Sequence, residues 1–201
     1  MKLYLVRHGE TDANRLLGHS VSGPMHNEPV TYTPGDDTNV VLNVYGRAQA
    51  QEAGTELPDT FDALYTSPLL RVKETAEIIA KMKEYDYSRV ILRDELVEYR
   101  MGKFEGLTTE EKQKIAPEGW GSGSRCTYDY TPWGGDSWKT IYDRVSRLLD
   151  ELKTTHAGQT IICVTSAGVI RMAYKIFFDE KAPGMTRHIL IKNGSVHQFI
   201  L

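Results

Sequence analysis

The N-terminal stretch reads Lys2-Leu-Tyr-Leu-Val6 and continues as Arg7-His8-Gly9-Glu10-Thr11. Its first half is apolar and rich in β-forming side chains, which predicts a short buried strand. The run stops at an arginine, a histidine and a glycine. In an open α/β sheet, functional groups gather where strands end in this way. The stretch therefore predicts both a fold class and the place of a site.

The three residues after the predicted strand suit a phosphate ligand. Arg7 carries a planar fork of N–H donors that matches phosphate oxygens and stays charged at any working pH. His8 can be neutral near pH 7, so a ring nitrogen can attack phosphorus and carry a phosphoryl group covalently. Gly9 allows a ligand to approach the main chain closely. The alternative is a histidine that ends a strand beside a surface arginine, and three residues alone do not separate the two.

Length and composition are those of an ordinary globular protein. The 201 residues are 25% charged and 40% hydrophobic, and they predict one domain over 1–201. A net charge of −3 and the lack of a long basic run argue against a nucleic-acid or anionic-membrane surface. Cys126 and Cys163 lie far apart and predict reduced thiols in a cytoplasmic protein. Arg7 and His8 interrupt the N-terminal apolar run too early for a signal peptide or a membrane span.

Strand and helix patterns alternate along the rest of the chain. Extended segments are predicted at 60–65, 90–92, 96–97, 160–164 and 195–201, and helices at 46–57, 108–115, 138–152 and 169–178. A further helix opens at Ser67-Pro68, where the serine can cap free N–H groups and the proline suits the first helical position. The continuously apolar run at 160–164 is typical of a central parallel strand. We therefore expect a three-layer α/β/α sandwich around a mainly parallel sheet.

Two long irregular segments, 19–43 and 117–135, interrupt this alternation. In the first, the turn Pro34-Gly35-Asp36-Asp37 predicts a hairpin. The second is rich in glycine, serine and aromatic side chains. Long loops in compact domains often cover functional sites, so we expect both segments to cover a substrate.

Three further positions carry candidate site residues. Arg71 lies in the first turn of a predicted helix, where a surface arginine is the usual alternative. Glu98 stands between two apolar residues, and burial there would raise the pKa of its carboxyl; the alternative is an exposed glutamate. After the strand at 160–164, Thr165-Ser166-Ala167-Gly168 leads into a helix whose free N–H groups offer an anion site.

Taken in order, these segments resemble the histidine phosphatase superfamily, which includes cofactor-dependent phosphoglycerate mutases and fructose-2,6-bisphosphatase. The resemblance spans nearly the whole chain and implies a phosphoglycerate mutase-like fold. It rests on Arg7-His8-Gly9-Glu10-Thr11 with Asn14, Tyr45–Ala50, Ser67–Glu77, Leu96–Glu98, Gly102–Leu107 and Gly135-Asp136-Ser137.

The resemblance implies a role for each matching residue. His8 would be the phosphorylated nucleophile, and Arg7, Asn14 and Arg71 would hold the phosphoryl oxygens. Glu98 would protonate the leaving alkoxide and then help water attack the phosphohistidine. Two arginine forks and a helix N-terminus supply the positive charge that phosphoryl transfer needs, so we expect no metal and no other cofactor. The expected substrate is a small phosphorylated metabolite.

The chain departs from the family pattern at one place. The family has His-Gly-Gly after the central strand, and here the residues are Ser166-Ala167-Gly168. A serine hydroxyl donates one hydrogen bond but carries no positive charge, and the loss of one such donor typically costs about 10²–10³ in rate. We therefore predict Ser166 and Ala167 in the phosphate pocket of a weakened or specialised phosphatase.

Two other functions stay open at this point. One is a phosphoglycerate mutase-type phosphotransferase, and the other is a pseudoenzyme that binds a phosphate ligand without turnover. His19, His26 and His188 are candidates to replace the missing ring. The sequence carries no signal for the identity of the substrate.

Overall fold

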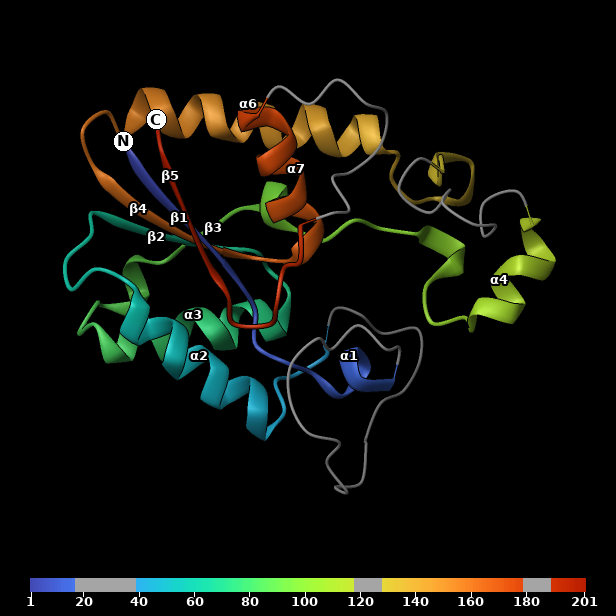
Figure 1. The fold of residues 1–201 in the computed structure, drawn as a ribbon, viewed down its shortest axis with the longest axis horizontal. Helices are drawn as coiled ribbons and strands as arrows, with labels where there is room; N and C mark the ends of the chain where they lie inside the picture. Colours follow the sequence, from blue (N-terminus) through green and yellow to red (C-terminus); the bar gives the residue numbers. More distant parts are fainter. Residues whose placement is uncertain (17–38, 118–127, 179–188) are drawn as a thin grey trace.

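The computed structural model describes residues 1–16, 39–117, 128–178 and 189–201. Within these ranges a five-stranded sheet has the order β3-β2-β4-β1-β5 (Figure 1). The strands are β1 (Lys2–Arg7), β2 (Ala63–Thr66), β3 (Ile91–Leu92), β4 (Thr160–Thr165) and β5 (Val196–Ile200). β1 to β4 run parallel to one another, and β5 pairs antiparallel with β1. The expected mainly parallel sheet is confirmed.

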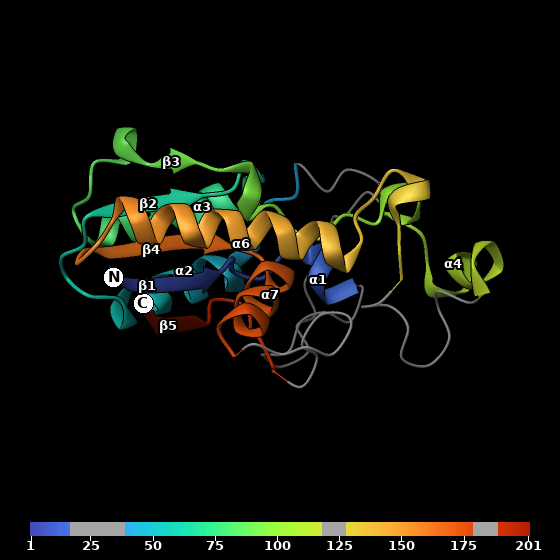
Figure 2. The same cartoon turned by 90° about the horizontal axis from the view of Figure 1, so that it is seen from above.

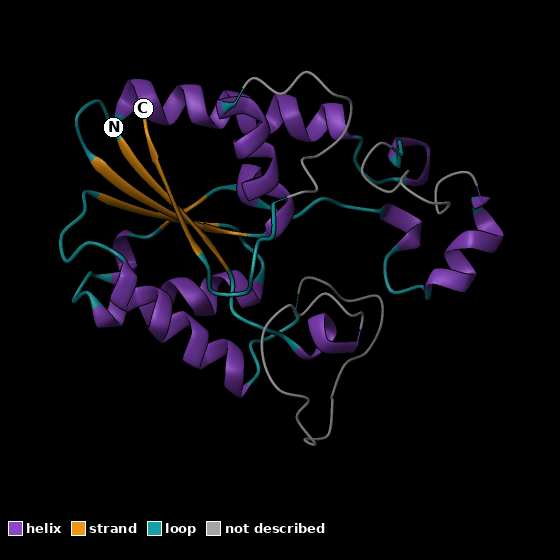
Figure 3. Ribbon diagram, in the orientation of Figure 1, coloured by secondary structure: helices purple, strands orange, loops and turns teal. Residues whose placement is uncertain are grey.

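Helices cover both faces of this sheet. α2 (Val44–Glu56) and α3 (Leu70–Met82) lie on one face, and α6 (Trp138–Thr155) and α7 (Ala167–Phe177) lie on the other (Figures 1 and 2). The three layers are separated clearly when helices and strands are coloured apart (Figure 3). The predicted α/β/α sandwich is therefore correct.

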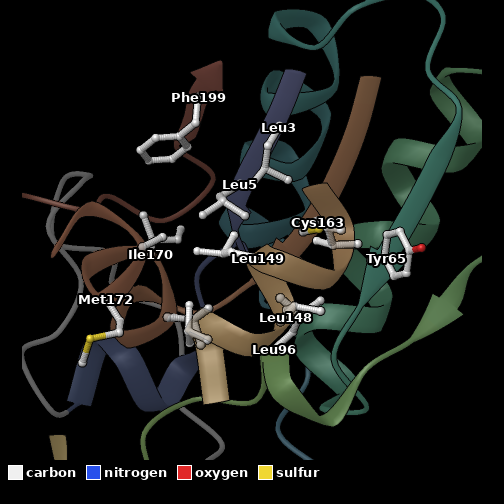
Figure 4. Packing of buried hydrophobic residues seen from close by; sticks show 14 of the residues in the cluster. Leu3, Leu5, Tyr65, Leu96, Leu148, Leu149, Cys163, Ile170, Met172 and Phe199 are labelled. Atoms are coloured by element: carbon white, nitrogen blue, oxygen red, sulfur yellow. The ribbon is translucent and has the colours of Figure 1, made fainter. Parts of the chain in front are cut away.

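Alternate residues of the central strands enter two apolar cores. Leu3 and Leu5 join the cluster beneath α6 and α7, where they lie near Ile170 (Figure 4). Val6 and Val164 belong to the second cluster, beneath α2 and α3. Because successive strand side chains point to opposite faces, a strand that is apolar throughout must be covered on both sides. The continuously apolar sequence of β1 and β4 thus requires the sandwich.

One of the two predicted helix caps is absent. α3 begins at Leu70, and its N-cap residue Leu69 makes no side-chain capping bond. The expected cap at Ser67 is wrong, because this residue lies three positions before the first helical residue and cannot reach the free N–H groups. The predicted cap of α6 is confirmed, since the Ser137 hydroxyl accepts from the Thr140 N–H at 3.1 Å.

Other boundaries shift by a few residues. α2 begins two residues early, because the Asn43 carboxamide accepts from the Gly46 N–H at 2.8 Å and caps the helix there. α7 begins at Ala167 rather than at Val169. The extended pair predicted at 96–97 is wrong at its first position, since Leu96 ends the short helix η2 (Asp94–Leu96).

The remaining described elements lie towards the side of the molecule where the strands end (Figure 1). They include α1 (Asp12–Leu16), η3 (Gly102–Phe104), α4 (Thr109–Ile115) and η5 (Thr131–Trp133), while η1 (Tyr87–Arg89) precedes β3. Aromatic rings gather here: Phe104 contacts Tyr130 and Trp133 edge to face, at centroid distances of 5.6 and 5.3 Å. The part of segment 117–135 that the structure describes is thus packed by its aromatic side chains.

Several predictions fall on residues that the structure does not describe. They are the hairpin around Pro34, most of segment 19–43, residues 118–127, Cys126 and the three histidines His19, His26 and His188. Cys163 is a free, buried thiol. Among the described helices none has the length and apolar character needed to cross a membrane.

Candidate active site

Arg7 ends β1 and is only 5% exposed. It lies opposite Thr165, the last residue of β4, so the carboxyl ends of two central strands meet here. One guanidinium nitrogen, Nη1, donates to the Ile191 carbonyl at 2.7 Å. Burial lowers the pKa of Arg7 to about 10, and the nearby Glu98 carboxylate opposes that shift. The guanidinium is therefore held in one place and stays cationic at neutral pH.

The His8 ring is buried and held in one tautomer. Its Nδ1 lies 2.7 Å from the Gly9 carbonyl oxygen. A carbonyl can only accept, so Nδ1 carries the proton and Nε2 keeps its lone pair. Burial, together with the charges of Arg71 and Arg7, holds the pKa of His8 well below its usual value. The ring is thus neutral at pH 7, with Nε2 available as a nucleophile.

Arg71 contacts the unprotonated nitrogen of His8, Nε2, directly. It is the second residue of α3, it is 4% exposed, and its Nε lies 3.3 Å from His8 Nε2. The alternative of a surface arginine is therefore wrong: the start of α3 delivers this guanidinium to the end of β1. A cation beside Nε2 is suited to neutralise an anion that the nitrogen attacks.

Glycine at position 9 serves a different purpose from the predicted one. A Cβ on Gly9 would lie 2.1 Å from the Gly46 carbonyl oxygen, so the close approach is to the backbone of α2. The Gly9 N–H donates to the Thr75 hydroxyl at 3.2 Å, and that hydroxyl donates to the Arg71 carbonyl at 2.8 Å. Gly9 thereby docks the strand end against α2 and α3, and this contact sets the position of His8.

Asn14 is oriented by two donors. Its Oδ1 accepts from the Thr11 N–H at 3.2 Å and from Asn193 Nδ2 at 3.0 Å. A reciprocal bond runs from the Asn14 N–H to the Thr11 hydroxyl at 3.1 Å. With Oδ1 fixed in this way, Asn14 Nδ2 keeps two N–H donors that these bonds do not use.

Glu98 occupies the helix N-terminus that the sequence predicted to be open to a ligand. Its Oε1 and Oε2 accept from the Gly168 N–H at 3.0 and 3.2 Å, and Oε1 also accepts from the Tyr99 N–H at 2.8 Å. A Cβ at position 168 would lie 2.1 Å from Oε1, so any larger residue there would displace the Glu98 carboxylate. The prediction of free N–H groups is thus wrong at Gly168, because the chain's own carboxylate binds that group.

Ser166 lies directly after β4, at the N-cap of α7, and it is fully buried. The carbonyl of its neighbour Thr165 accepts from the His8 N–H at 2.9 Å, so the ends of β4 and β1 lie side by side. The Ser166 hydroxyl has no hydrogen-bond partner among the residues that the structure describes. Ala167 is also buried.

The fold thus gathers arginine, histidine, asparagine and glutamate side chains from four separate segments at one sheet edge: Arg7 with His8, Asn14, Arg71 and Glu98. In the described ranges no group of three histidine, cysteine, aspartate or glutamate side chains is arranged to hold a metal ion.

Comparisons with known proteins show the family of the chain. A sequence model of the histidine phosphatase superfamily (branch 1) matches residues 3–201. The chain belongs to this superfamily. Phosphoglycerate mutase-like protein 4 of Arabidopsis thaliana is 32% identical over 207 residues, which cover 100% of this chain and 79% of the relative. A metal-independent phosphoserine phosphatase of the same plant is 32% identical over 177 residues, 86% of this chain and 67% of the relative.

Among the solved structures that resemble this chain is a phosphoserine phosphatase of Entamoeba histolytica. Its complex with 3-phosphoglyceric acid is 26% identical and has a TM-score of 0.70, with 99% of this chain and 90% of that chain covered. A mutant of the same enzyme was solved with phosphoserine and has a TM-score of 0.69 at 27% identity. Membership of the family, with relatives of this kind, supports metal-independent phosphatase activity for this histidine phosphatase.

Sequence reasoning missed the residues that hydrogen-bond to the candidate site residues and fix their positions. Thr75, Ile191 and Asn193 all bond to its members. Asn193 stands before Gly194, and an Asn-Gly pair is typical of a turn, which accounts for a polar residue there without a site. No local pattern connects residue 193 to residue 14.

Proposed function

We propose that this histidine phosphatase is a phosphomonoesterase that acts on small phosphorylated metabolites through a phosphohistidine at His8. The observation that carries the proposal is the state of the His8 ring. It is buried and neutral, its Nδ1 proton is bound to Gly9, and its Nε2 lies 3.3 Å from Arg71 Nε. An unprotonated Nε2, whose lone pair accepts from the Arg71 Nε–H, is a nucleophile beside a fixed cation, and this arrangement suits attack on an anionic phosphorus centre once that bond gives way to the substrate.

The proposed reaction has two steps that balance. His8 Nε2 attacks phosphorus, the bond between phosphorus and the alcohol oxygen breaks, and protonated Glu98 gives its proton to that oxygen. In the second step Glu98 takes a proton from water, the water oxygen attacks phosphorus, and the bond to Nε2 breaks. Inorganic phosphate leaves, and both side chains return to their starting states.

Arg7, Arg71 and Asn14 have the proposed role of binding the phosphoryl oxygens. Burial strengthens the interaction of both guanidinium groups with an anion, since little water competes for their donors. Ser166 is proposed to stand where the family has its second histidine, with Ala167 beside it. Its hydroxyl can donate one further bond to the phosphoryl group.

A second candidate function rests on Ser166. A fully buried serine cannot supply the positive charge of a histidine, which favours a pseudoenzyme that binds phosphate ligands and turns over slowly or not at all. We place the phosphatase first because the nucleophile, two arginines and the acid candidate are all present.

The names of the relatives support a substrate class. The Entamoeba structures contain a phosphorylated three-carbon acid or amino acid, so we propose substrates of similar size. A cytoplasmic location stays a prediction from cysteine usage.

The proposal is tested by phosphate release from a panel of phosphorylated metabolites, in excess chelator, together with intact-mass detection of the phosphoryl enzyme. We expect turnover in chelator and a phosphorylated form that His8→Ala abolishes. His156→Gln is a matched control, because His156 bonds to Tyr65 and Gln159 near the opposite end of the strands. Full activity in His8→Ala would overturn the phosphohistidine route, and phosphate binding without release would favour the pseudoenzyme.

A further inference from the structure

The segment Ile191–Ser195, which we call the backing segment, contacts Arg7, His8 and Asn14 of the candidate site. The Ile191 carbonyl accepts from Arg7 Nη1 at 2.7 Å, and the Ser195 carbonyl accepts from the Arg7 N–H at 3.1 Å. The Gly194 N–H lies 3.2 Å from the Arg7 carbonyl oxygen and 3.3 Å from that of His8. The segment therefore holds the end of β1 by both backbone and side chain.

Asn193 makes the most specific contacts of this segment. It is 5% exposed, and its Nδ2 lies 3.2 Å from the His8 carbonyl oxygen and 3.0 Å from Asn14 Oδ1. A side-chain amide has two N–H bonds, so Asn193 uses both of them here. One bond goes to the backbone of His8, the proposed nucleophile, and the other to the side chain of Asn14, a proposed phosphate ligand.

Backbone groups fix the orientation of both amides. The His8 carbonyl can only accept, so the atom of Asn193 that faces it must be the NH2 group. The Thr11 N–H can only donate, so the atom of Asn14 that faces it must be the oxygen. The two assignments agree, because they leave a donor of Asn193 opposite an acceptor of Asn14. Reversal of the Asn14 amide would place its NH2 group against two donors.

We propose that Asn193 is a positioning residue that orients the Asn14 carboxamide so that its NH2 group faces the phosphoryl oxygens. The inference rests on the proposed function only through the role of Asn14. Without Asn193, one donor holds Asn14 Oδ1 instead of two. The amide then samples orientations that turn its oxygen towards the anion, where it repels instead of binding.

A double-mutant cycle tests the proposal. Asn193→Leu keeps the approximate size and removes both donors, and it is made in the wild type and in Asn14→Ala. Two quantities are measured: kcat/KM for para-nitrophenyl phosphate, and the dissociation constant of inorganic phosphate by calorimetry. In the wild type we expect Asn193→Leu to reduce kcat/KM and phosphate affinity by about tenfold. In Asn14→Ala we expect the same change to have less than about a twofold effect, because the two residues act through one contact.

Equal losses in both backgrounds would overturn the proposal, because Asn193 would then act through His8 or through general stability. Phosphate binding unchanged by Asn193→Leu would overturn it as well. If Asn193→Leu does not fold, Asn193→Ser repeats the cycle with one small donor kept, and the same criterion applies. The calorimetric measurement is valid without turnover, so a failed phosphatase proposal and a failed Asn193 proposal give different results.

Discussion

Replacing Gly168 by alanine should separate the chemistry of Glu98 from phosphate binding. The methyl carbon would lie 2.1 Å from Glu98 Oε1, whereas an ordinary contact begins at 3.4 Å. The carboxylate must therefore retreat by roughly 1 Å or more, and a displacement of that size at a reacting group can cost about 10²-fold in rate. The helix itself tolerates alanine, which is favoured over glycine by about 0.5–1 kcal/mol in a helix.

The assay compares substrates that differ in their need for an acid. We expect Gly168→Ala to reduce kcat by about 10²-fold for phosphoserine, whose alkoxide must be protonated as it leaves. The loss should be much smaller for para-nitrophenyl phosphate, since its phenolate leaves without help. Phosphate affinity should change little, because the new methyl group would meet atoms of Glu98 and Tyr99 and not of the proposed phosphate ligands Arg7 and Arg71.

Gly54→Ala is the matched control. It also lies buried in a helix, and its new methyl group would meet the flexible end of Met82, with Sδ at 2.6 Å. We expect activity close to that of the wild type. An activity of Gly168→Ala within about threefold of the wild type on phosphoserine would refute the role of Glu98 as the acid, and so would an equal loss on both substrates.

Three further outcomes are expected. Ser166→His combined with Ala167→Gly should raise kcat/KM on a phosphomonoester, with a gain that approaches about 10²-fold. Unchanged kinetics in a folded double mutant would favour the pseudoenzyme over the phosphatase. Arg71→Lys should weaken phosphate binding in calorimetry, by about tenfold or more, because an ammonium group cannot reproduce the fork beside His8; unchanged binding would contradict that assignment. His8 has a lowered pKa in the folded state, so its contribution to stability is full above pH 6.5 and is lost as the pH falls from there towards the folded-state value. Chemical denaturation from pH 7 to 5, in buffer without phosphate, measures how the free energy of unfolding falls with pH. The wild type should show an extra decrease of at most about 1.4 kcal/mol per pH unit that His8→Asn lacks. The same pH dependence in both proteins would contradict a neutral, buried His8.

Much of the fold followed from local pattern. Apolar runs that are continuous rather than alternating require cover on both faces, so β1 and β4 had to be central strands between helices. The cap at Ser137 could be predicted because capping depends on residues within one turn. The candidate ligands could be named from the sequence as well, because several segments of the family pattern occur in order; Arg7, His8 and Gly9 alone did not separate a phosphate site from an ordinary strand end.

Tertiary structure alone decided how these groups work. The tautomer of His8 depends on a bond to its own neighbour, but the low pKa that keeps the ring neutral comes from burial and from Arg71, which lies 63 residues away. Glu98 covers the N–H of Gly168 across 70 residues, and Asn193 orients Asn14 across 179. Sequence periodicity reports on one turn or one strand at a time. Contacts of this range exist only after the sheet has brought its strand ends together, and they determine which atom of each side chain faces the site.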